Sequence, residues 1–556
     1  MALNLRNIFE HPSRVFALIA LTVMLPMLLP GYIFALDMSF VPHLRMPENV
    51  TSSYPFYVLL HALNWILPSQ LIQKTMLFLI LFLSGLGAYK LIRALQQVQI
   101  DNIMTNYRVL GCYVGGALYM INPFTYDRFM AGQFAVLLGY ALLPFFSMCL
   151  LGLLRHPTLK QGALLGLWTS LIAILSIHTI GLLAVLGVSG ILAILLTQKT
   201  VVGYGARLGS SLALSLGLFL VLNSFWIIPL ELGKNSTAQA ISSFTTADQR
   251  AFATVGSNLI NKLINVMQLQ GFWAEGENLY LLPQEAFPLW GLAVIGLWVI
   301  AYIGGHSMWK HKQRLPVIWF GAAALIAILL ATTNLLPVLS KHIELLAGYR
   351  EPQKFVGLVA LAFAIFVGYA IPVLLTRYQQ KQPVTFNAAF AGILMLPILL
   401  TPTMYGAFAF QLMPHHYPAD WDMINTQLSN DKSKGRVLFL PWHLYMQFGF
   451  SDRITVNPAA EYFNKDVIVS NSLEYHDASP TVPSHEKTQI GTILKTAKNY
   501  NDLGAELNKH HIKYILLARD QDYKSYNYLS KQKDLSPVAQ TTHFDMYRNE
   551  SYKEEK

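Results

Sequence analysis

The stretch that decides the fold is RVFALIALTVMLPMLLPGYIFALD, residues 14–37. No charged side chain lies between Arg14 and Asp37, and the run is as long as the roughly 20 residues that a helix needs to cross a bilayer. We therefore expect a first membrane-spanning helix near 14–36. Asp37 would then lie where this helix meets the outer water, at the start of a short polar loop that contains Arg45 and Glu48.

Similar apolar windows recur up to about residue 410, and the chain of 556 residues is 54% hydrophobic and only 13% charged. An ordinary soluble protein does not have this composition. The windows lack the alternation of barrel strands, so helices must satisfy the backbone. The segment 55–70 is too short to span and contains His61, Asn64 and Pro68, so we expect it to lie along the membrane surface. We expect about eleven spans, near 14–36, 72–93, 108–123, 134–154, 162–177, 181–198, 207–230, 287–305, 316–337, 356–376 and 387–408.

Loop charges indicate the orientation, because Lys and Arg near span ends accumulate on the cytoplasmic side. Glu10 and Asp101 are the only acidic residues in the loops expected inside, and all other charged residues of these loops are basic. The N-terminus is thus expected inside, the first helix is an uncleaved anchor, and the C-terminus lies outside the plasma membrane. The net charge of +10 reflects this orientation and does not indicate nucleic-acid binding. The inner basic residues are Arg6, Arg14, Lys90, Arg93, Arg108, Arg155, Lys160, Lys199, Arg207, Lys310, Lys312, Arg314, Arg377 and Lys381.

Composition changes near residue 412, which predicts a transmembrane domain over 1–411 and an extracytoplasmic α/β domain over 412–556. In the second domain the runs 436–442, 466–471, 513–519 and 543–549 are rich in β-branched, leucine and aromatic residues and predict strands, and 487–510 has a helical pattern. The long outer loop 231–286 is expected to form an ordered cap with an amphipathic piece at 257–267. The fold class is thus mainly α, a polytopic helical bundle with a small α/β domain.

Asp37 is the leading candidate for a catalytic base. A carboxylate at the outer surface suits an enzyme that acts on a lipid-linked substrate, because transfer of a sugar from a polyprenyl phosphate needs a base for the acceptor hydroxyl. The departing phosphate also needs cationic or metal help. The alternative is that Asp37 only caps an interfacial helix.

Three further sets of residues are candidates at the same surface. Asp127 and Arg128 lie in YMINPFTYDRFMAGQ (119–133), where they either close the site or merely cap a helix and pair with each other. Basic residues beside an acid in AGYREPQKF (347–355) either hold a lipid phosphate or snorkel to the interface. His178, in SIHTIG (176–181), is either functional or a satisfied structural histidine. The basic and acidic residues of 347–355 are Arg350, Glu351 and Lys354.

Aromatic and polar residues of the tail, in LPWHLYMQF (440–448) and NPAAEYF (457–463), have the composition of sugar-contacting sites. Such residues are equally common in any α/β core. The sequence contains no Gly-rich phosphate loop, nucleophile elbow or His and Cys cluster with metal spacing. The tail candidates are His443, Tyr445, Glu461 and Tyr462.

With these residues in view, the chain resembles the glycosyltransferase-C superfamily, in particular its arabinofuranosyltransferase-like and uncharacterised multi-spanning bacterial and archaeal members, over about 410 residues. The resemblance rests on Asp37 after the first span, an interfacial segment in the first outer loop, Asp127 after the third span and an outer tail. YDRFMAGQ and YREPQKF also look like recurrent elements of the uncharacterised relatives. The resemblance implies that Asp37 is the base and that Asp127 helps to bind a divalent cation, Mg²⁺ or Mn²⁺. Many members have paired acids in the first loop, whereas Met38 and Ser39 follow Asp37 here.

The expected function is that of a membrane glycosyltransferase, which moves a sugar from a polyprenyl-phosphate donor to a surface glycan or lipid-linked acceptor at the outer leaflet. In this hypothesis Arg128, Arg350 and Lys354 contact the donor phosphate. A flippase or transporter for a lipid-linked glycan is one alternative, but its spans would carry charges along a path, and these spans are nearly free of charge. A non-catalytic assembly protein, whose tail binds glycan or a protein partner, is the other.

Overall fold

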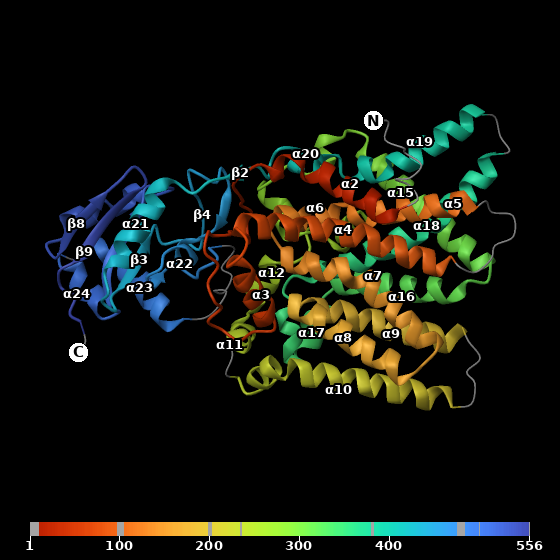
Figure 1. Ribbon diagram of the computed structural model, residues 1–556, viewed down its shortest axis with the longest axis horizontal. Helices are drawn as coiled ribbons and strands as arrows, with labels where there is room; N and C mark the ends of the chain where they lie inside the picture. The colour runs from red at the N-terminus through yellow and green to blue at the C-terminus, as the bar shows by residue number, and fades with distance from the viewer. Residues whose placement is uncertain are drawn as a thin grey trace.

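The computed structural model describes residues 11–96, 105–197, 203–233, 236–379, 383–474, 484–499 and 501–554. It consists of a bundle of long helices and a C-terminal domain with a β-sheet at one end of that bundle (Figure 1). Some loop residues used for the orientation lie outside the described part of the chain. They are Arg6, Glu10, Asp101, Lys199 and Lys381.

Each predicted span contains a helix, but the predicted number of spans is only partly supported. Within the described residues, seven helices are long and apolar enough to cross a membrane, or eight if the bent pair Phe390–Leu400 and Pro402–Ala409 forms one span. The apolar helices Pro12–Leu28 and Leu159–Leu175 are shorter. The helices at the predicted spans are α2 (Pro12–Met24), α4 (Ser69–Leu95), α5 (Thr105–Met120), α7 (Phe134–Arg155), α8 (Leu159–Leu175), α9 (Thr179–Thr197), α10 (Tyr204–Glu231), α15 (Trp290–Lys310), α16 (Arg314–Thr332), α18 (Val356–Gln379) and α19 (Pro383–Leu400).

The first helix is shorter than the predicted span 14–36. After α2 the chain forms one 3-10 turn, η1 (Leu25–Leu28), and then the strand β1 (Tyr32–Ile33), which pairs with β2 (Pro414–His415). Pro26 and Pro30 lack the amide donors that would continue the helix. The Gln73 side chain of α4 then bonds both backbone groups of Ile33, at 2.9 and 2.7 Å. Asp37 therefore follows a pinned extended segment and does not cap the first helix.

Short elements fill the end of the bundle that faces the C-terminal domain, and Figure 1 shows α3, α11 and α12 there. The segment expected along the membrane surface contains α3 (Tyr54–Asn64), a helix separate from α4. The cap predicted at 231–286 contains α11 (Ser236–Ser243), α12 (Thr246–Ala251), α13 (Leu259–Met267), η2 (Trp273–Glu277) and α14 (Pro283–Ala286). The remaining short elements are α6 (Pro123–Met130), α17 (Leu335–Ser340), η3 (Glu344–Gly348), η4 (Pro352–Phe355), η5 (Pro402–Met404) and α20 (Tyr405–Ala409).

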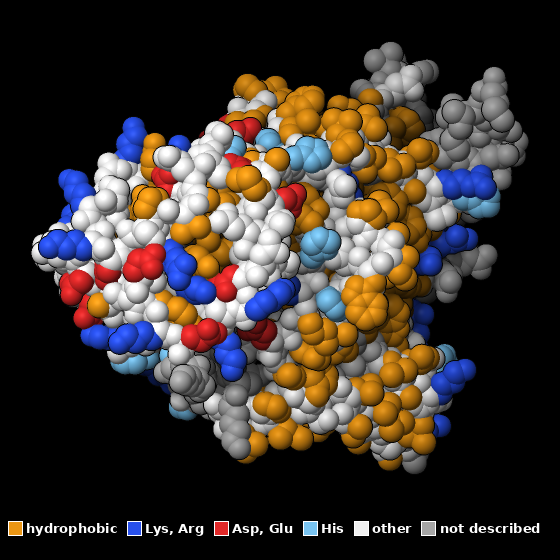
Figure 2. Space-filling model, turned by 60° about the vertical axis from the view of Figure 1, so that its left-hand side comes forward, with side chains coloured by type: hydrophobic (Ala, Val, Ile, Leu, Met, Phe, Trp, Pro, Cys, Tyr) orange, Lys and Arg blue, Asp and Glu red, His pale blue; other side chains and the backbone are white. Residues whose placement is uncertain are grey.

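The surface of the bundle is mostly hydrophobic, and Lys and Arg side chains gather at the end remote from the C-terminal domain (Figure 2). The C-terminal domain instead carries mixed charges on this face. This distribution is the one expected for a helical membrane protein with a basic inner surface. The orientation itself stays a prediction.

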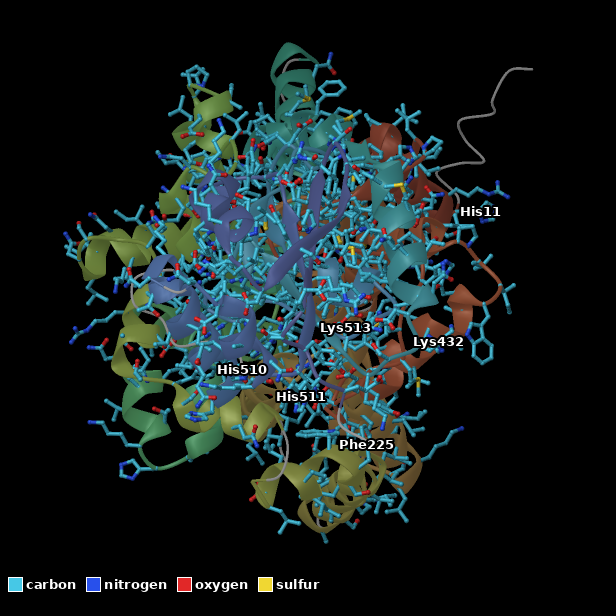
Figure 3. The ribbon with its side chains drawn as sticks, turned by 90° about the vertical axis from the view of Figure 1, so that its left-hand side faces the viewer. His11, Phe225, Lys432, His510, His511 and Lys513 are labelled. Atoms are coloured by element: carbon cyan, nitrogen blue, oxygen red, sulfur yellow. The ribbon has the colours of Figure 1, made fainter. Side chains whose placement is uncertain are left out.

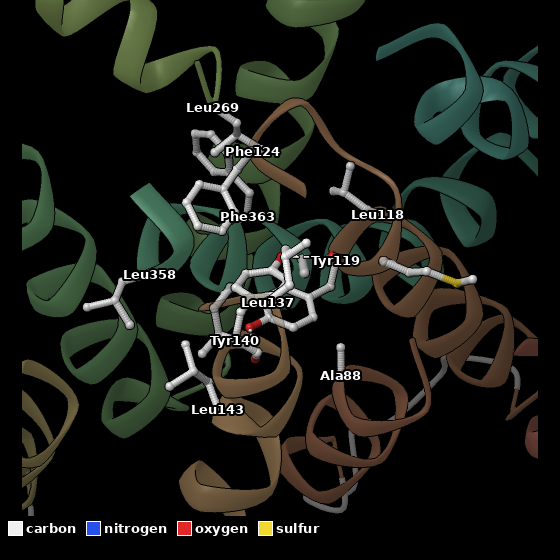
Figure 4. Close-up of a cluster of buried hydrophobic side chains, with 14 of the residues drawn as sticks. Ala88, Leu118, Tyr119, Phe124, Leu137, Tyr140, Leu143, Leu269, Leu358 and Phe363 are labelled. Carbon is white, nitrogen blue, oxygen red and sulfur yellow. Dashed lines mark hydrogen bonds between the residues drawn. The ribbon is translucent and has the colours of Figure 1, made fainter. Parts of the chain in front are cut away.

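A packed aromatic core holds the short helix α6 in place (Figure 4). The rings of Tyr119 and Tyr140 stack with their centroids 4.1 Å apart, and each hydroxyl donates to the other residue's carbonyl, at 2.8 and 2.7 Å. Asn122, next to this pair, caps α6 by accepting the Thr125 amide at 3.1 Å. The cap fixes the start of the helix that carries Asp127 and Arg128.

The described part of the C-terminal domain has a five-stranded sheet with the order β6-β3-β7-β9-β8. The four predicted strand runs are confirmed. Alternate residues of β3 face opposite layers: Val437 and Phe439 pack with Trp421 of α21, and Leu438 and Leu440 pack with α23 and α24. The predicted boundary at residue 411 stays a prediction. The bounds are α21 (Ala419–Asn430), β3 (Arg436–Leu440), β4 (Tyr445–Gln447), β5 (Ile454–Val456), α22 (Ala459–Tyr462), β6 (Val467–Ile468), α23 (His485–Thr496), η6 (Ala497–Asn499), α24 (Leu503–Asn508), β7 (Ile512–Ala518), η7 (Tyr523–Lys531), β8 (Leu535–Gln540) and β9 (Phe544–Asn549).

Candidate functional site

The C-terminal domain covers the middle of the bundle end near Asp37. Figure 3 looks at the molecule from this side, with His510, His511 and Lys513 of the C-terminal domain in front of the helices. The hairpin β4–β5 pairs Tyr445 with Val456 and lies directly on the loop that contains Asp37. The candidate site is thus enclosed by both parts of the chain.

Asp37 is half-buried and held on three sides. Its amide donates to the Ala131 carbonyl at 2.8 Å, and its carboxylate accepts the Tyr445 hydroxyl at 2.7 Å and the Gln133 side-chain amide at 3.2 Å. Burial raises the pKa of Asp37, although the hydrogen bond from Tyr445 lowers it, and the nearby Glu351 charge raises it further. The result is an oriented carboxylate that binds a proton more readily than an exposed aspartate.

A buried ion cluster lies next to Asp37. Glu351 pairs with Arg128 at 2.8 Å and with Lys354 at 3.3 Å, and the exposed fractions of these three residues are 7%, 1% and 4%. Gln133 donates to Glu351 at 3.3 Å as well as to Asp37, so one amide group joins the two carboxylates. Burial would raise the pKa of Glu351, but Lys354 and Arg128 outweigh it, and the pKa is lowered. Glu351 therefore stays ionised.

His178 and Arg350 complete the group around Glu351. The His178 ring meets the edge of Tyr349 with centroids 5.9 Å apart, and burial together with the Lys354 charge lowers its pKa to about 3, so the ring is neutral. The Arg350 guanidinium packs over the rings of Phe244 and Phe252, at 4.8 and 4.4 Å. Segments that are far apart in the sequence thus meet at Glu351. Their roles in catalysis stay predictions.

Asp127 is not part of this group, contrary to the expectation that it converges with Asp37. It is 1% exposed, accepts the Tyr280 hydroxyl at 3.2 Å and shares a hydrogen bond with Glu275. Burial, reinforced by the Glu275 charge, raises its pKa well above the ordinary value. Successive residues of a helix point in directions about 100° apart, so Arg128 faces Glu351 while Asp127 faces the cap.

The surroundings of Asp127 do not fit a divalent cation. Its one carboxylate neighbour, Glu275, already accepts the amides of Gly271 and Phe272 at 2.7 and 2.8 Å. Among the described residues, no group of three His, Cys, Asp or Glu side chains is arranged to hold a metal. Hard cations such as Mg²⁺ need several oxygen ligands. The divalent cation that the resemblance implies therefore stays a prediction.

A small recess lies on the Arg350 side of the cluster. Arg350 and Lys262 are its two charged lining residues, and Tyr349 and Asn334 also line it. Asp37 and Asp127 do not line this recess, and the expectation that both acids share one pocket stays a prediction. The charge of Arg350 is partly balanced by the buried Asp248, which lies 3.8 Å from its guanidinium.

Several residues of the site were not anticipated. Gln133, which links the two carboxylates, stands in the turn after α6, and nothing in its sequence context separates it from an ordinary polar turn residue. Glu275 and Tyr280 belong to the cap, where only the acidic and aromatic content of QGFWAEGENLYLLP was a signal. Tyr445 was named only as a candidate for sugar contact, with an ordinary core residue as the alternative, and its contact with Asp37 was not foreseen.

Gly132 supports the Asp37 loop, and its replacement by Ala is expected to destabilise the protein. Its φ of +72° favours glycine, and an added Cβ would lie 2.7 Å from the Met38 Cβ. We expect Gly132→Ala to cost about 1–3 kcal/mol and to lower the unfolding temperature and the activity together. Thermal unfolding of the purified protein measures this. Gly209→Ala is the control and should not destabilise the protein, because Gly209 lies on an exposed helix face with open space around it. Equal unfolding temperatures of the two variants would contradict a special requirement for glycine at position 132.

The fold is similar to that of a known arabinofuranosyltransferase. A solved structure of arabinofuranosyltransferase AftD from Mycobacteria matches 99% of this chain with a TM-score of 0.65 and 14% sequence identity. A mutant of the same protein matches 97% with a TM-score of 0.53 and 14% identity. The chain spans 40% and 42% of the length of these two chains. No family model and no curated protein matches the chain. At this identity the likeness shows the fold alone.

Proposed function

We propose that the protein is a membrane glycosyltransferase that transfers a sugar from a polyprenyl-phosphate donor to a glycan or lipid-linked acceptor outside the plasma membrane. The observation that carries this proposal is the oriented, half-buried Asp37 carboxylate beside the buried Glu351 cluster, at one end of a helical bundle with an AftD-like fold. The clustering of buried carboxylates at this one end supports an interfacial enzyme more than a transport path.

Asp37 acts as the general base in this proposal. It accepts the proton of the acceptor hydroxyl while the acceptor oxygen forms a bond to the anomeric carbon, and the bond from that carbon to the phosphate oxygen breaks. Polyprenyl phosphate leaves with the electron pair. The raised pKa of Asp37 strengthens the base, and it also means that activity should fall as the pH drops through that raised pKa.

Basic residues near Glu351 bind the donor phosphate in this proposal. Arg128 uses one guanidinium nitrogen for Glu351, while its buried Nε and Nη2 have no hydrogen-bond partner among the described residues. A phosphate oxygen would satisfy these groups, because a guanidinium offers a two-pronged grip. Arg350 borders the recess and also pairs with the buried Asp248 at 3.8 Å, so in this proposal it adds positive charge on that side of the site. Lys354 is paired with Glu351 and contributes positive charge from beneath the site.

The experiment that tests the function uses purified protein in lipid nanodiscs, a panel of polyprenyl-phosphate sugars and glycan acceptors. We expect a glycosylated acceptor and free polyprenyl phosphate in equal amounts, detected by mass spectrometry. Hydrolysis of the donor without transfer, or no change in any donor by protein that unfolds cooperatively, would contradict the proposal.

Asp127→Asn separates a structural role of Asp127 from the ligand role that the resemblance implies. Asn can still accept the Tyr280 hydroxyl, and it removes a buried carboxyl whose ionisation burial opposes. We expect the rate of glycosyl transfer to stay within about tenfold of the wild-type rate, because the general base Asp37 is still present. Transfer rates at several Mg²⁺ and Mn²⁺ concentrations measure this. A loss as large as that of Asp37→Asn, with a changed metal requirement, would instead support a metal or acceptor ligand.

A further inference from the structure

The hairpin β4–β5 of the C-terminal domain binds the Asp37 loop through three hydrogen bonds. The Val456 amide donates to the Leu36 carbonyl at 2.8 Å, and the Thr455 hydroxyl donates to the Ala35 carbonyl at 2.9 Å. The Tyr445 hydroxyl, on the paired strand, donates to Asp37 Oδ1 at 2.7 Å. Three consecutive residues of the loop are thus held by one element of the other domain.

The same hairpin is anchored in the C-terminal domain on its far side. The Gln447 amide donates to the Gln521 side chain at 3.0 Å, and the Gly449 amide donates to Asp520 at 2.8 Å, directly after the end of β7. Met446 is fully buried in the core that contains Trp421. The position of Tyr445 is therefore set by the packed sheet and not by a free loop.

We propose that the C-terminal domain completes the active site, with Tyr445 as the positioning residue that holds the Asp37 carboxylate for catalysis. The inference deepens the proposed function and rests on it. Of the two side chains that bond the Asp37 carboxylate, Tyr445 makes the shorter contact, and Gln133 divides its amide between Asp37 and Glu351. Without the C-terminal domain, the Asp37 carboxylate would lose the Tyr445 hydroxyl, and the carbonyls of Ala35 and Leu36 would lose their hydrogen bonds from the hairpin.

Tyr445→Phe removes the hydroxyl and keeps the ring, so it isolates the hydrogen bond. That bond favours the charged form of Asp37, and its loss raises the pKa of Asp37 further. Two measurements report this. The first is the pH midpoint of carbodiimide labelling of Asp37, read by mass spectrometry, which needs no activity. The second is the acid limb of the pH profile of kcat/KM for glycosyl transfer.

We expect both midpoints to move upward by about one pH unit in Tyr445→Phe, since a hydrogen bond to a charged group corresponds to a shift of this size. Tyr462→Phe is the matched control, because its hydroxyl donates to another carboxylate of the same domain, Asp422, at 2.6 Å. It should leave both midpoints unchanged. Thr455→Val weakens the docking of the hairpin but keeps the Tyr445 hydroxyl, so it should lower the unfolding temperature and leave the labelling midpoint in place.

The outcomes separate this inference from the proposed function. An unchanged labelling midpoint in folded Tyr445→Phe overturns the positioning role, whatever the activity. An equal shift in Tyr462→Phe overturns it too, because the effect would then not be local. A shifted labelling midpoint in protein that transfers no sugar supports the contact between Tyr445 and Asp37 and contradicts the glycosyltransferase assignment.

Discussion

Replacing Asp37 by Asn is expected to lower the rate of glycosyl transfer by about 10²- to 10⁴-fold, the usual contribution of a general base. The amide keeps the size of the side chain and can still accept the Tyr445 hydroxyl, but it cannot take a proton from the acceptor. Folding should not suffer, because burial already disfavours the charged carboxylate. The unfolding temperature is therefore expected to be unchanged or slightly raised, which separates lost chemistry from lost structure.

Asp452→Asn is the matched control for this variant. Asp452 lies in the turn between β4 and β5, in the hairpin that contacts the Asp37 loop, but its side chain is 79% exposed. Its replacement should leave the transfer rate unchanged, because an exposed carboxylate without a substrate contact contributes little. Both rates are measured with the donor that the wild type uses, at a pH well above the acid limb. Full activity of Asp37→Asn would remove Asp37 as the base.

Replacing Glu351 by Gln is expected to destabilise the protein by about 3–5 kcal/mol, because it leaves two buried cations without their counter-charge. Arg128 and Lys354 both pair with Glu351, and all three residues are less than one-tenth exposed. The lowered pKa of Glu351 gives the sign of the pH dependence. Its contribution is complete at pH values above the ordinary carboxyl range and is lost only as the pH falls through the lowered pKa.

A second variant makes this prediction specific to charge. Arg128→Met combined with Glu351→Gln leaves one buried cation, Lys354, and should unfold at a higher temperature than Glu351→Gln alone. Glu486→Gln is the control at a partly exposed pair, since Glu486 bonds Arg436 at 2.6 Å with 39% of its side chain exposed. It should cost less than about 1 kcal/mol. The three variants are compared by thermal unfolding in one detergent. An unfolding temperature of Glu351→Gln equal to that of the wild type would show that the buried cations need no counter-charge.

The membrane class, the helices and the strands could be predicted from the sequence, because these features depend on local periodicity. Runs such as 134–154 and 356–376 are apolar over their whole length, and RVLFLPW, KYILLAR and HFDMYRN are compact strand patterns. The first span was overestimated, since apolar residues continue after α2, whereas Pro26 and Pro30 redirect the backbone into an extended segment. Hydropathy alone does not distinguish these two conformations.

The site was only partly predictable, because its contacts join residues far apart in the chain. Tyr445 lies 408 positions from Asp37, and Glu351 lies 223 positions from Arg128. The sequence predicted that these residues lie at the same surface, but it did not indicate which pairs of them would be in contact. Asp127 was grouped with Asp37 because it lies in the outer turn after the third predicted span. The direction of its side chain, however, depends on the rotation of α6, which the Asn122 cap and the aromatic core determine.

The proposed function is tested most directly by a cryo-EM structure of Asp37→Asn in nanodiscs with an intact polyprenyl-phosphate sugar, since this variant should bind the donor without consuming it. The proposed function predicts that the sugar lies against position 37 and Tyr445, with the phosphate on the Arg128 and Arg350 side and the lipid chain at the membrane surface. Donor density bound elsewhere, with position 37 and Tyr445 still packed against each other and touching no sugar, would contradict it.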